Sequence, residues 1–161
     1  MIKTSPGNEL DALDLLILQE LQINGRISYV ELAPRVNLSP PAIHNRMKRL
    51  EQNGYIRCYV ALLDWKQMGY DMLCFISISL QMHQPQSVAH FRAMIQEMPE
   101  VLECHHVTGE FDYLLKVAIR DRSDLERFVV ARLTPIPGIA RIYTSLTLTE
   151  IKNSTALPIR A

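Results

Sequence analysis

Residues 38–50, LSPPAIHNRMKRL, determine how the first part of the chain folds. Ser39 followed by Pro40 predicts a helix start, because a serine side chain caps a helix and a proline needs no amide donor in the first turn. Gly54 predicts the end of this helix, since glycine commonly follows the last helical turn. Three apolar residues recur at helical spacing and predict a stripe that faces a core: Ile43, Met47 and Leu50.

Two further helices are expected before this one. Leucine and isoleucine recur at helical spacing over residues 11–24, with Asp11 as the capping residue. Ser28 and Glu31 have the spacing of a capping box and predict a short helix that ends at about Val36. Three short helices with tight connections form a helix-turn-helix.

The sequence pattern changes after this unit. Residues 56–63 predict an extended segment, and residues 64–69 predict a connector. Apolar and polar residues alternate over 74–82, which predicts a strand with one wetter face. The elements that follow are a helix, two strands around a turn, a helix opened by a capping box, and a last strand: residues 88–98, 101–107, 111–119, 123–133 and 139–151.

This order of elements predicts an α+β fold for the second part, the ferredoxin-like βαββαβ arrangement. Both helices then pack on one face of an antiparallel sheet. The opposite face of the sheet must be covered by something else, and a second copy of the chain is the simplest candidate. We therefore predict two domains, residues 1–63 and residues 64–161.

The charges of the chain are unevenly distributed. The formal net charge is 0, yet residues 32–50 contain four cations and no acid, while residues 64–161 hold ten Lys and Arg against eleven Asp and Glu. Taken alone, the basic segment favours a solvated amphipathic helix. The helix-turn-helix spacing and the acid-free window together favour DNA binding, with an amide and a long cation at base edges and arginines at phosphates. The predicted DNA-binding residues are Ser39, Pro41, His44, Asn45, Arg46, Lys48 and Arg49.

Other kinds of site are not indicated. Cys58, Cys74 and Cys104 are far apart, which predicts reduced thiols in a cytoplasmic protein. His105 and His106 are neighbours on a predicted strand, so their side chains point to opposite faces and are poorly placed to bind one metal ion. No catalytic arrangement stands out, so we predict neither an enzyme nor a cofactor. No apolar run reaches the roughly 18 residues of a membrane helix.

The turn at residues 108–113 is the candidate small-molecule site. Gly109 can adopt a positive φ, which lets its backbone approach a carboxylate. Asp112 can accept a charge-assisted hydrogen bond from an ammonium group, and Tyr113 supplies a hydroxyl and an apolar wall. A plain hairpin turn, whose aspartate caps backbone amides, explains the same spacing equally well.

Motifs from both halves resemble the Lrp/AsnC family of bacterial and archaeal regulators. They are LDALDLLILQEL (10–21), NGRIS (24–28), ELA (31–33), LSPPAIHNRMKRLEQNGYI (38–56), VTGEFDYLLKV (107–117) and PGIARIYTSLTLTEIKNSTALPI (137–159). Two positions depart from the family pattern. Ile142 stands where many relatives have threonine, and Pro34 falls late in the second helix, which should shorten it.

The resemblance implies a winged helix-turn-helix joined to a ferredoxin-like ligand-binding and oligomerisation domain. It further implies dimers that assemble into tetramers or octamers, a nucleoid-associated location, and double-stranded DNA as a partner. An amino acid effector is expected near the turn, at subunit contacts. The effector-binding residues that we predict are Gly109, Glu110, Asp112, Tyr113, Thr144 and Thr147.

Two alternatives share this architecture. An architectural protein that bridges DNA without an effector has every feature except a working pocket. An enzyme similar to the siroheme decarboxylases would use His105 or His106 to hold a tetrapyrrole. The basic helix and the lack of a catalytic arrangement favour a sequence-specific transcriptional regulator whose assembly and DNA binding respond to an amino acid.

Overall fold

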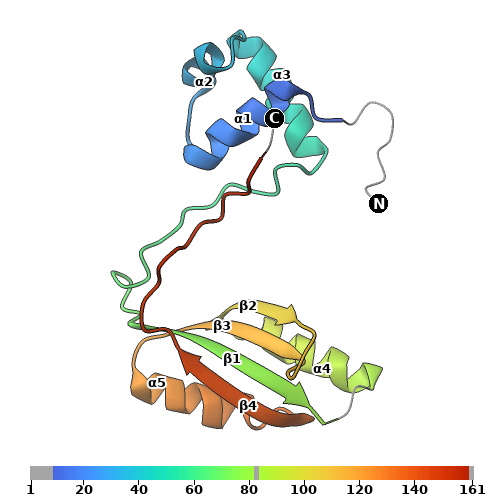
Figure 1. Cartoon of the computed structure of the whole chain (residues 1–161), viewed down its shortest axis with the longest axis vertical. Coiled ribbons are helices and arrows are strands. Elements are labelled where there is room, and N and C mark those ends of the chain that lie inside the picture. Colours follow the sequence, from blue (N-terminus) through green and yellow to red (C-terminus); the bar gives the residue numbers. More distant parts are fainter. Residues whose placement is uncertain (1–8, 82–83, 160–161) are drawn as a thin grey trace. The chain divides into compact units, whose positions relative to one another are not determined.

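The computed structural model describes residues 9–81 and 84–159 and divides the chain into two compact units (Figure 1). The first unit comprises the chain up to Ala61 together with the chain from Lys152 onward, and the second unit is Leu62–Ile151. The division expected from the sequence, after residue 63, lies two residues from the first of these boundaries. It differs at the other end, because the tail from Lys152 onward belongs to the first unit rather than to the second.

The first unit contains the three predicted helices, α1 (Ala12–Ile23), α2 (Tyr29–Arg35) and α3 (Pro40–Gln52). Each begins where a side chain caps it: Asp11 and Ser28 form capping boxes, and the Ser39 hydroxyl accepts a hydrogen bond from the Ala42 amide. α3 ends at Gln52, and Gly54 follows two residues later with a φ of +75°, a conformation that other residues rarely adopt. The local signals in the sequence therefore place all three helices correctly.

The core of the first unit is small and apolar. The stripe predicted on α3 is buried, together with residues from α1, α2 and their connections: Ile17, Ile27, Leu32, Ala33, Val36, Ile43, Met47 and Leu50. Pro34 lies inside α2, which ends one residue later at Arg35. The segment after α3, expected to be extended, forms no strand with any described part of the chain.

The tail is bound to α1 through its backbone. The Gln22 side chain donates to the Leu157 carbonyl at 3.1 Å and accepts from the Leu157 amide at 2.5 Å. Gln19 donates to the Ile159 carbonyl at 3.1 Å. Both glutamines thus act as hydrogen-bond partners for an extended segment, and the helix-turn-helix unit is built from both parts of the chain.

The second unit is the predicted βαββαβ domain (Figure 1). Its sheet has the strand order β2-β3-β1-β4, and every neighbouring pair is antiparallel. The elements are β1 (Met72–Leu80), α4 (Pro85–Gln96), β2 (Val101–His106), β3 (Tyr113–Ile119), α5 (Arg122–Arg127) with a π-helical continuation (Phe128–Leu133), and β4 (Ile139–Leu146).

The two faces of the sheet differ as expected. One face packs against α4, α5 and the π-helical turn, and it carries the core residues Ile76 and Leu115, which pair across β1 and β3. The other face carries Phe75 and Tyr143, which are 38% and 59% exposed, and the half-buried Ser77. The predicted wetter face is therefore confirmed.

Two local predictions in this unit are wrong. The last helix is not opened by a capping box at Ser123. The carboxylate of Asp121 caps it instead, accepting from the Asp124 amide at 2.8 Å and from the Ser123 hydroxyl at 2.6 Å. The Asp121 carboxylate is a stronger acceptor than a hydroxyl, and the Ser123 hydroxyl donates to it instead of capping the helix. The last strand ends at Leu146 rather than 151, because the chain then leaves the sheet toward the first unit.

Candidate functional site

The outward face of α3 carries most of the predicted DNA-binding residues. Opposite the buried stripe, Pro41, His44, Asn45 and Lys48 are all exposed. The Tyr29 ring from α2 meets His44 edge-on, with 5.7 Å between ring centroids. This face therefore presents an imidazole, an amide and an ammonium group side by side, which are groups that reach base edges and phosphates.

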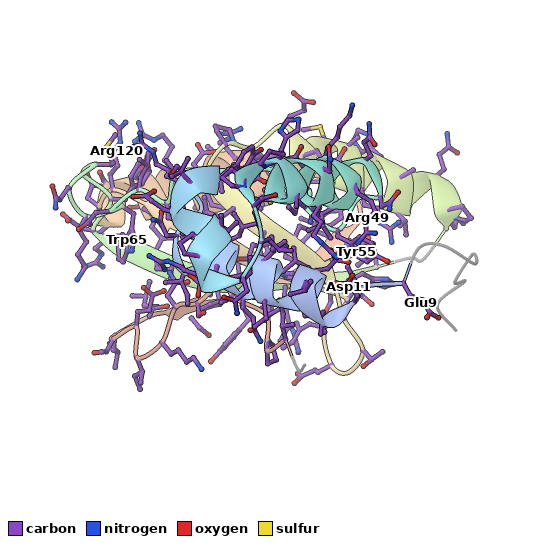
Figure 2. All side chains as sticks on the ribbon, turned by 90° about the horizontal axis from the view of Figure 1, so that it is seen from above. Glu9, Asp11, Arg49, Tyr55, Trp65 and Arg120 are labelled. Carbon is purple, nitrogen blue, oxygen red and sulfur yellow. The ribbon has the colours of Figure 1, made fainter. Side chains whose placement is uncertain are left out.

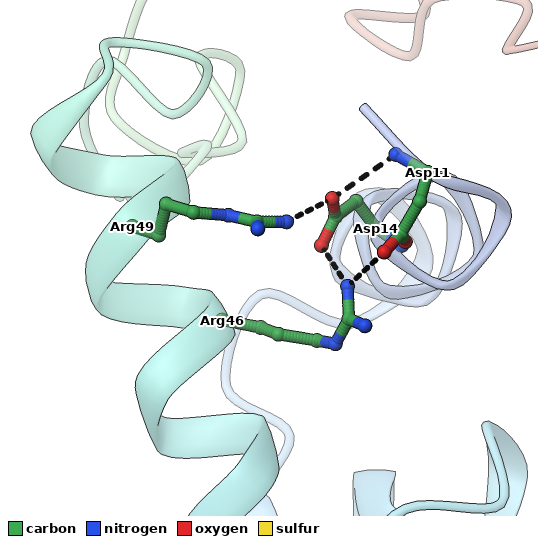
Figure 3. A network of polar contacts seen from close by, with 4 residues as sticks. All are labelled: Asp11, Asp14, Arg46 and Arg49. Carbon is green, nitrogen blue, oxygen red and sulfur yellow. Dashed lines mark hydrogen bonds and ion pairs between the residues drawn. The ribbon is translucent and has the colours of Figure 1, made fainter. Parts of the chain in front are cut away.

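Two arginines of α3 are engaged inside the unit instead (Figure 3). Arg46 Nη1 lies 2.7 Å from Asp14 Oδ1 and 2.6 Å from Asp11 Oδ2. Arg49 donates to Asp14 Oδ2, which also accepts from the Asp11 amide at 3.1 Å. The Asp14 side chain is fully buried, whereas Arg46 is 23% and Arg49 45% exposed. The two arginines thus neutralise a buried carboxylate and join α3 to α1.

This network shifts the pKa values of Asp11 and Arg46. The hydrogen bond from Arg46 is the main cause that holds the pKa of Asp11 below its ordinary value. Hydrogen bonds to Asp11 and Asp14 raise the pKa of Arg46 further above its ordinary value. Asp11 and Arg46 are therefore both charged at neutral pH, and they form an ionic link between α1 and α3.

The basic window is less positive than the linear sequence indicates. Arg35 pairs with Glu20 of α1 at 2.6 Å, in addition to the two arginines that pair with Asp14. Among the residues that the structure describes, Lys48 is the one cation of the window that makes no ion pair. Acids that lie well before the window in the sequence thus reach it through the packing of α1.

The turn before β3 has a defined geometry. Gly109 has a φ of +120°, which L side chains rarely adopt, so glycine is favoured here by conformation and not by space. The Asp112 carboxylate accepts from the Leu80 amide at 2.7 Å, and its own amide donates to the Ile78 carbonyl at 2.9 Å. The aspartate therefore caps a backbone amide, as the plain hairpin alternative required.

Two arginines that the sequence did not indicate also contact this turn. Arg92 of α4 donates from Nε to the hydroxyl of the buried Tyr113 at 3.2 Å. Arg141 of β4 pairs with Glu110 and lies over the Phe111 ring, 4.7 Å from its centroid. Both are distant in sequence, so only the strand pairing and the packing of α4 reveal them.

Of the two predicted threonines, Thr144 lies opposite a residue two positions along β1 from the anchor of the turn, and Thr147 lies farther away. Thr144 pairs with Ile76 of β1, and the Thr147 amide donates to the Leu73 carbonyl at 2.9 Å. The turn is anchored at Ile78, five residues along β1 from Leu73, which corresponds to about 17 Å at the usual rise per residue. Within one chain the structure therefore gathers Gly109, Glu110, Asp112 and Tyr113 but not Thr147.

The remaining candidates do not converge. His105 pairs with Glu103 at 2.9 Å, whereas the His106 ring stacks on Tyr113 at 4.9 Å, so the two imidazoles lie on opposite faces of β2. In the described part of the chain, no group of three metal-ligating side chains comes together. Burial raises the pKa of the Cys74 and Cys104 thiols. No helix in the described ranges is long and apolar enough to span a membrane.

Comparison with known proteins agrees with this architecture. Residues 10–57 match the profile of a winged helix-turn-helix DNA-binding domain, and residues 73–157 match the Lrp/AsnC ligand-binding domain. The leucine-responsive regulatory proteins of Salmonella typhimurium and of Escherichia coli K12 are each 40% identical over 158 residues, spanning 98% of this chain and 96% of theirs.

Solved structures give the same result. A transcriptional regulator from Neisseria meningitidis in complex with L-Met is 39% identical and superposes with a TM-score of 0.90, covering 93% of this chain and 97% of that one. AsnC from E. coli is 31% identical with a TM-score of 0.84, covering 93% and 99%. The resemblance noted in the sequence is confirmed, and the chain belongs to the Lrp/AsnC family of transcriptional regulators.

Proposed function

We propose that this chain reads specific DNA sequences through the outward face of α3 and that an amino acid bound to its second unit changes this binding. The observation that carries the proposal is the exposed face of α3 in a complete helix-turn-helix, with Lys48 free of any ion pair among the described residues. An α-helix of this kind fits the major groove of B-DNA. The proposal includes no catalytic step, metal or cofactor, and it places the protein on the nucleoid in the cytoplasm.

Side chains on α3 have different roles in this proposal. Asn45 and Lys48 lie opposite the buried stripe and reach base edges, since an amide and an ammonium group both recognise groups in the major groove. Ser39 and Pro41 lie at the N-terminal end of the helix, where a phosphate is favoured by the helix dipole. Arg46 and Arg49 position α3 against α1, and this role is primarily structural.

The effector that fits the turn is a free amino acid with an apolar side chain. Asp112 supplies an acceptor for an ammonium group, and Arg92 beside Tyr113 supplies a cation for a carboxylate. The leucine-responsive relatives and the L-Met complex of the Neisseria regulator support the choice of leucine or methionine. The amino acid can change DNA affinity only to the extent that it binds one assembly of the protein more tightly than another.

Asp112→Asn is expected to weaken effector binding about 10- to 100-fold, because the ammonium loses its charged partner. Asparagine can still accept the hydrogen bond from the Leu80 amide, so the turn keeps its structure. Calorimetry with leucine and methionine, followed by the other L-amino acids, measures the effect. Glu126→Gln removes the same charge from an exposed site on α5 and serves as the matched control. Unchanged affinity in Asp112→Asn would move the effector site away from this turn.

The protein is expected to be an oligomer built on dimers. The sheet face that carries Phe75 and Tyr143 is not covered by any helix in the described ranges, and a second copy covers it best. Light scattering should give a multiple of the chain mass, 18.5 kDa. Tyr143→Glu should lower that mass, whereas Val130→Glu, on an exposed helical surface, should not. A monomer at micromolar concentration would refute this assembly.

A further inference from the structure

A second pocket lies in the second unit at the end of the sheet away from the Gly109 turn. It has a volume of about 310 Å³ and is lined by Trp65, Lys66, Asp71, Thr147 and Glu150, among others. Thr147 is fixed to Leu73, about 17 Å along β1 from the residue that anchors the turn. The two sites are therefore separate within one chain.

The pocket wall is well ordered by its own hydrogen bonds. The Asp64 carboxylate accepts from the Lys66 and Gln67 amides at 3.0 and 3.3 Å, and the Tyr70 amide donates to the Trp65 carbonyl at 3.0 Å. These bonds close the turn that presents Trp65, which is labelled in Figure 2. Lys66 Nζ lies 5.5 Å from the centroid of the indole ring.

Several polar side chains of this pocket have no hydrogen-bond or ion-pair partner among the described residues. The Thr147 hydroxyl is buried and has no hydrogen-bond partner in the described structure, a costly state for a hydroxyl. Among the described residues, Lys66, Asp71 and Glu150 form no ion pair either. A pocket with an ammonium group, carboxylates, an unpaired hydroxyl and an indole ring is complementary to a small zwitterion with an apolar part.

We propose that this pocket is a second amino acid site. Lys66 would bind the α-carboxylate, Asp71 or Glu150 the α-ammonium, and Thr147 would complete its hydrogen bonding to the ligand, whose side chain lies on Trp65. The site adjoins both segments through which the chain enters and leaves the second unit, near Leu62 and Ile151. Its occupancy therefore restrains both connections to the DNA-binding unit, independently of the turn at Gly109.

Trp65 is the single tryptophan of the chain and reports on this pocket directly. Titration of the full-length protein with each of the twenty L-amino acids should give a saturable change in Trp65 fluorescence for at least one of them. Thr147→Val and Lys66→Met should each weaken that binding about tenfold. The first variant removes one hydrogen bond and the second one ion contact, and the loss of either typically lowers affinity by about this factor. Asp112→Asn, at the other site, should leave it unchanged.

Three outcomes would overturn the proposal. No fluorescence change with any amino acid would mean that the Thr147 hydroxyl is bonded to water alone. Wild-type affinity in Lys66→Met or Thr147→Val would place the ligand elsewhere. Loss of the signal in Asp112→Asn, with or without loss in the pocket variants, would show that the signal depends on the Gly109 turn and that no separate site exists.

Discussion

Replacing Arg46 and Arg49 together with methionine is expected to lower the free energy of unfolding of the first unit by about 3–5 kcal/mol. Both side chains donate to Asp14, whose carboxylate is fully buried, and without them the Asp11 amide is its one remaining hydrogen-bond partner among the described residues. Methionine keeps much of the aliphatic contact, so the loss is mainly electrostatic. Hydrogen exchange of the α1 and α3 amides measures the effect separately from the second unit.

Two further variants make this result interpretable. Arg35→Met removes the exposed pair with Glu20 and should cost less than about 1 kcal/mol. Adding Asp14→Leu to the double arginine variant removes the buried charge and should restore much of the stability. The interpretation fails if the double variant loses no more than Arg35→Met, or if the triple variant is no more stable than the double.

Lys48→Ala is expected to weaken DNA binding about tenfold or more while leaving the fold intact, because its side chain is exposed and makes no ion pair with the described residues. DNA fragments selected with the purified wild-type protein, and random DNA of equal length, provide the two substrates. A phosphate contact predicts an equal loss on both and a salt slope lower by about one. A base contact predicts a larger loss on the selected DNA.

The matched control is Lys152→Ala, which removes the same charge from the same unit but outside α3. Its affinity and salt slope should stay close to those of the wild type. Lys48 is a better test than Arg46 or Arg49, since either arginine variant can lose DNA binding by loosening α3 from α1. Equal affinities for Lys48→Ala and wild type on selected DNA would remove this face of α3 from the interface.

Sequence reasoning succeeds where structure is determined locally. Ser28, Ser39 and Asp11 each satisfy amides of the helix that follows them, so the three helix starts are visible in a few adjacent residues. The same reasoning fails at Ser123, because Asp121 competes for the same role and the sequence contains both. The alternation in β1 identifies the two faces of the sheet, since side chains on a strand have a period of two.

The candidate sites were less predictable because they depend on contacts between distant segments. The acid-free window is strongly basic in the linear sequence. In the structure, Asp14 of α1 neutralises part of that charge by pairing with Arg46 and Arg49. The sequence predicts Thr147 as an effector contact, and strand register places it beside Leu73, away from the turn within one chain. Arg92 was missed for the same reason, since nothing in its neighbourhood in the sequence points to Tyr113.

The attachment of the tail to α1 has a consequence for biosynthesis. Gln22 is translated early, but its partner Leu157 follows only after the whole of the second unit, Leu62–Ile151. At ordinary elongation rates the delay is about 7 to 27 s, long enough for the intervening domain to fold first. The helix-turn-helix of a nascent chain therefore leaves the ribosome without its last strand-like segment. Its full stability is reached only after Leu157 and Ile159 have been synthesised.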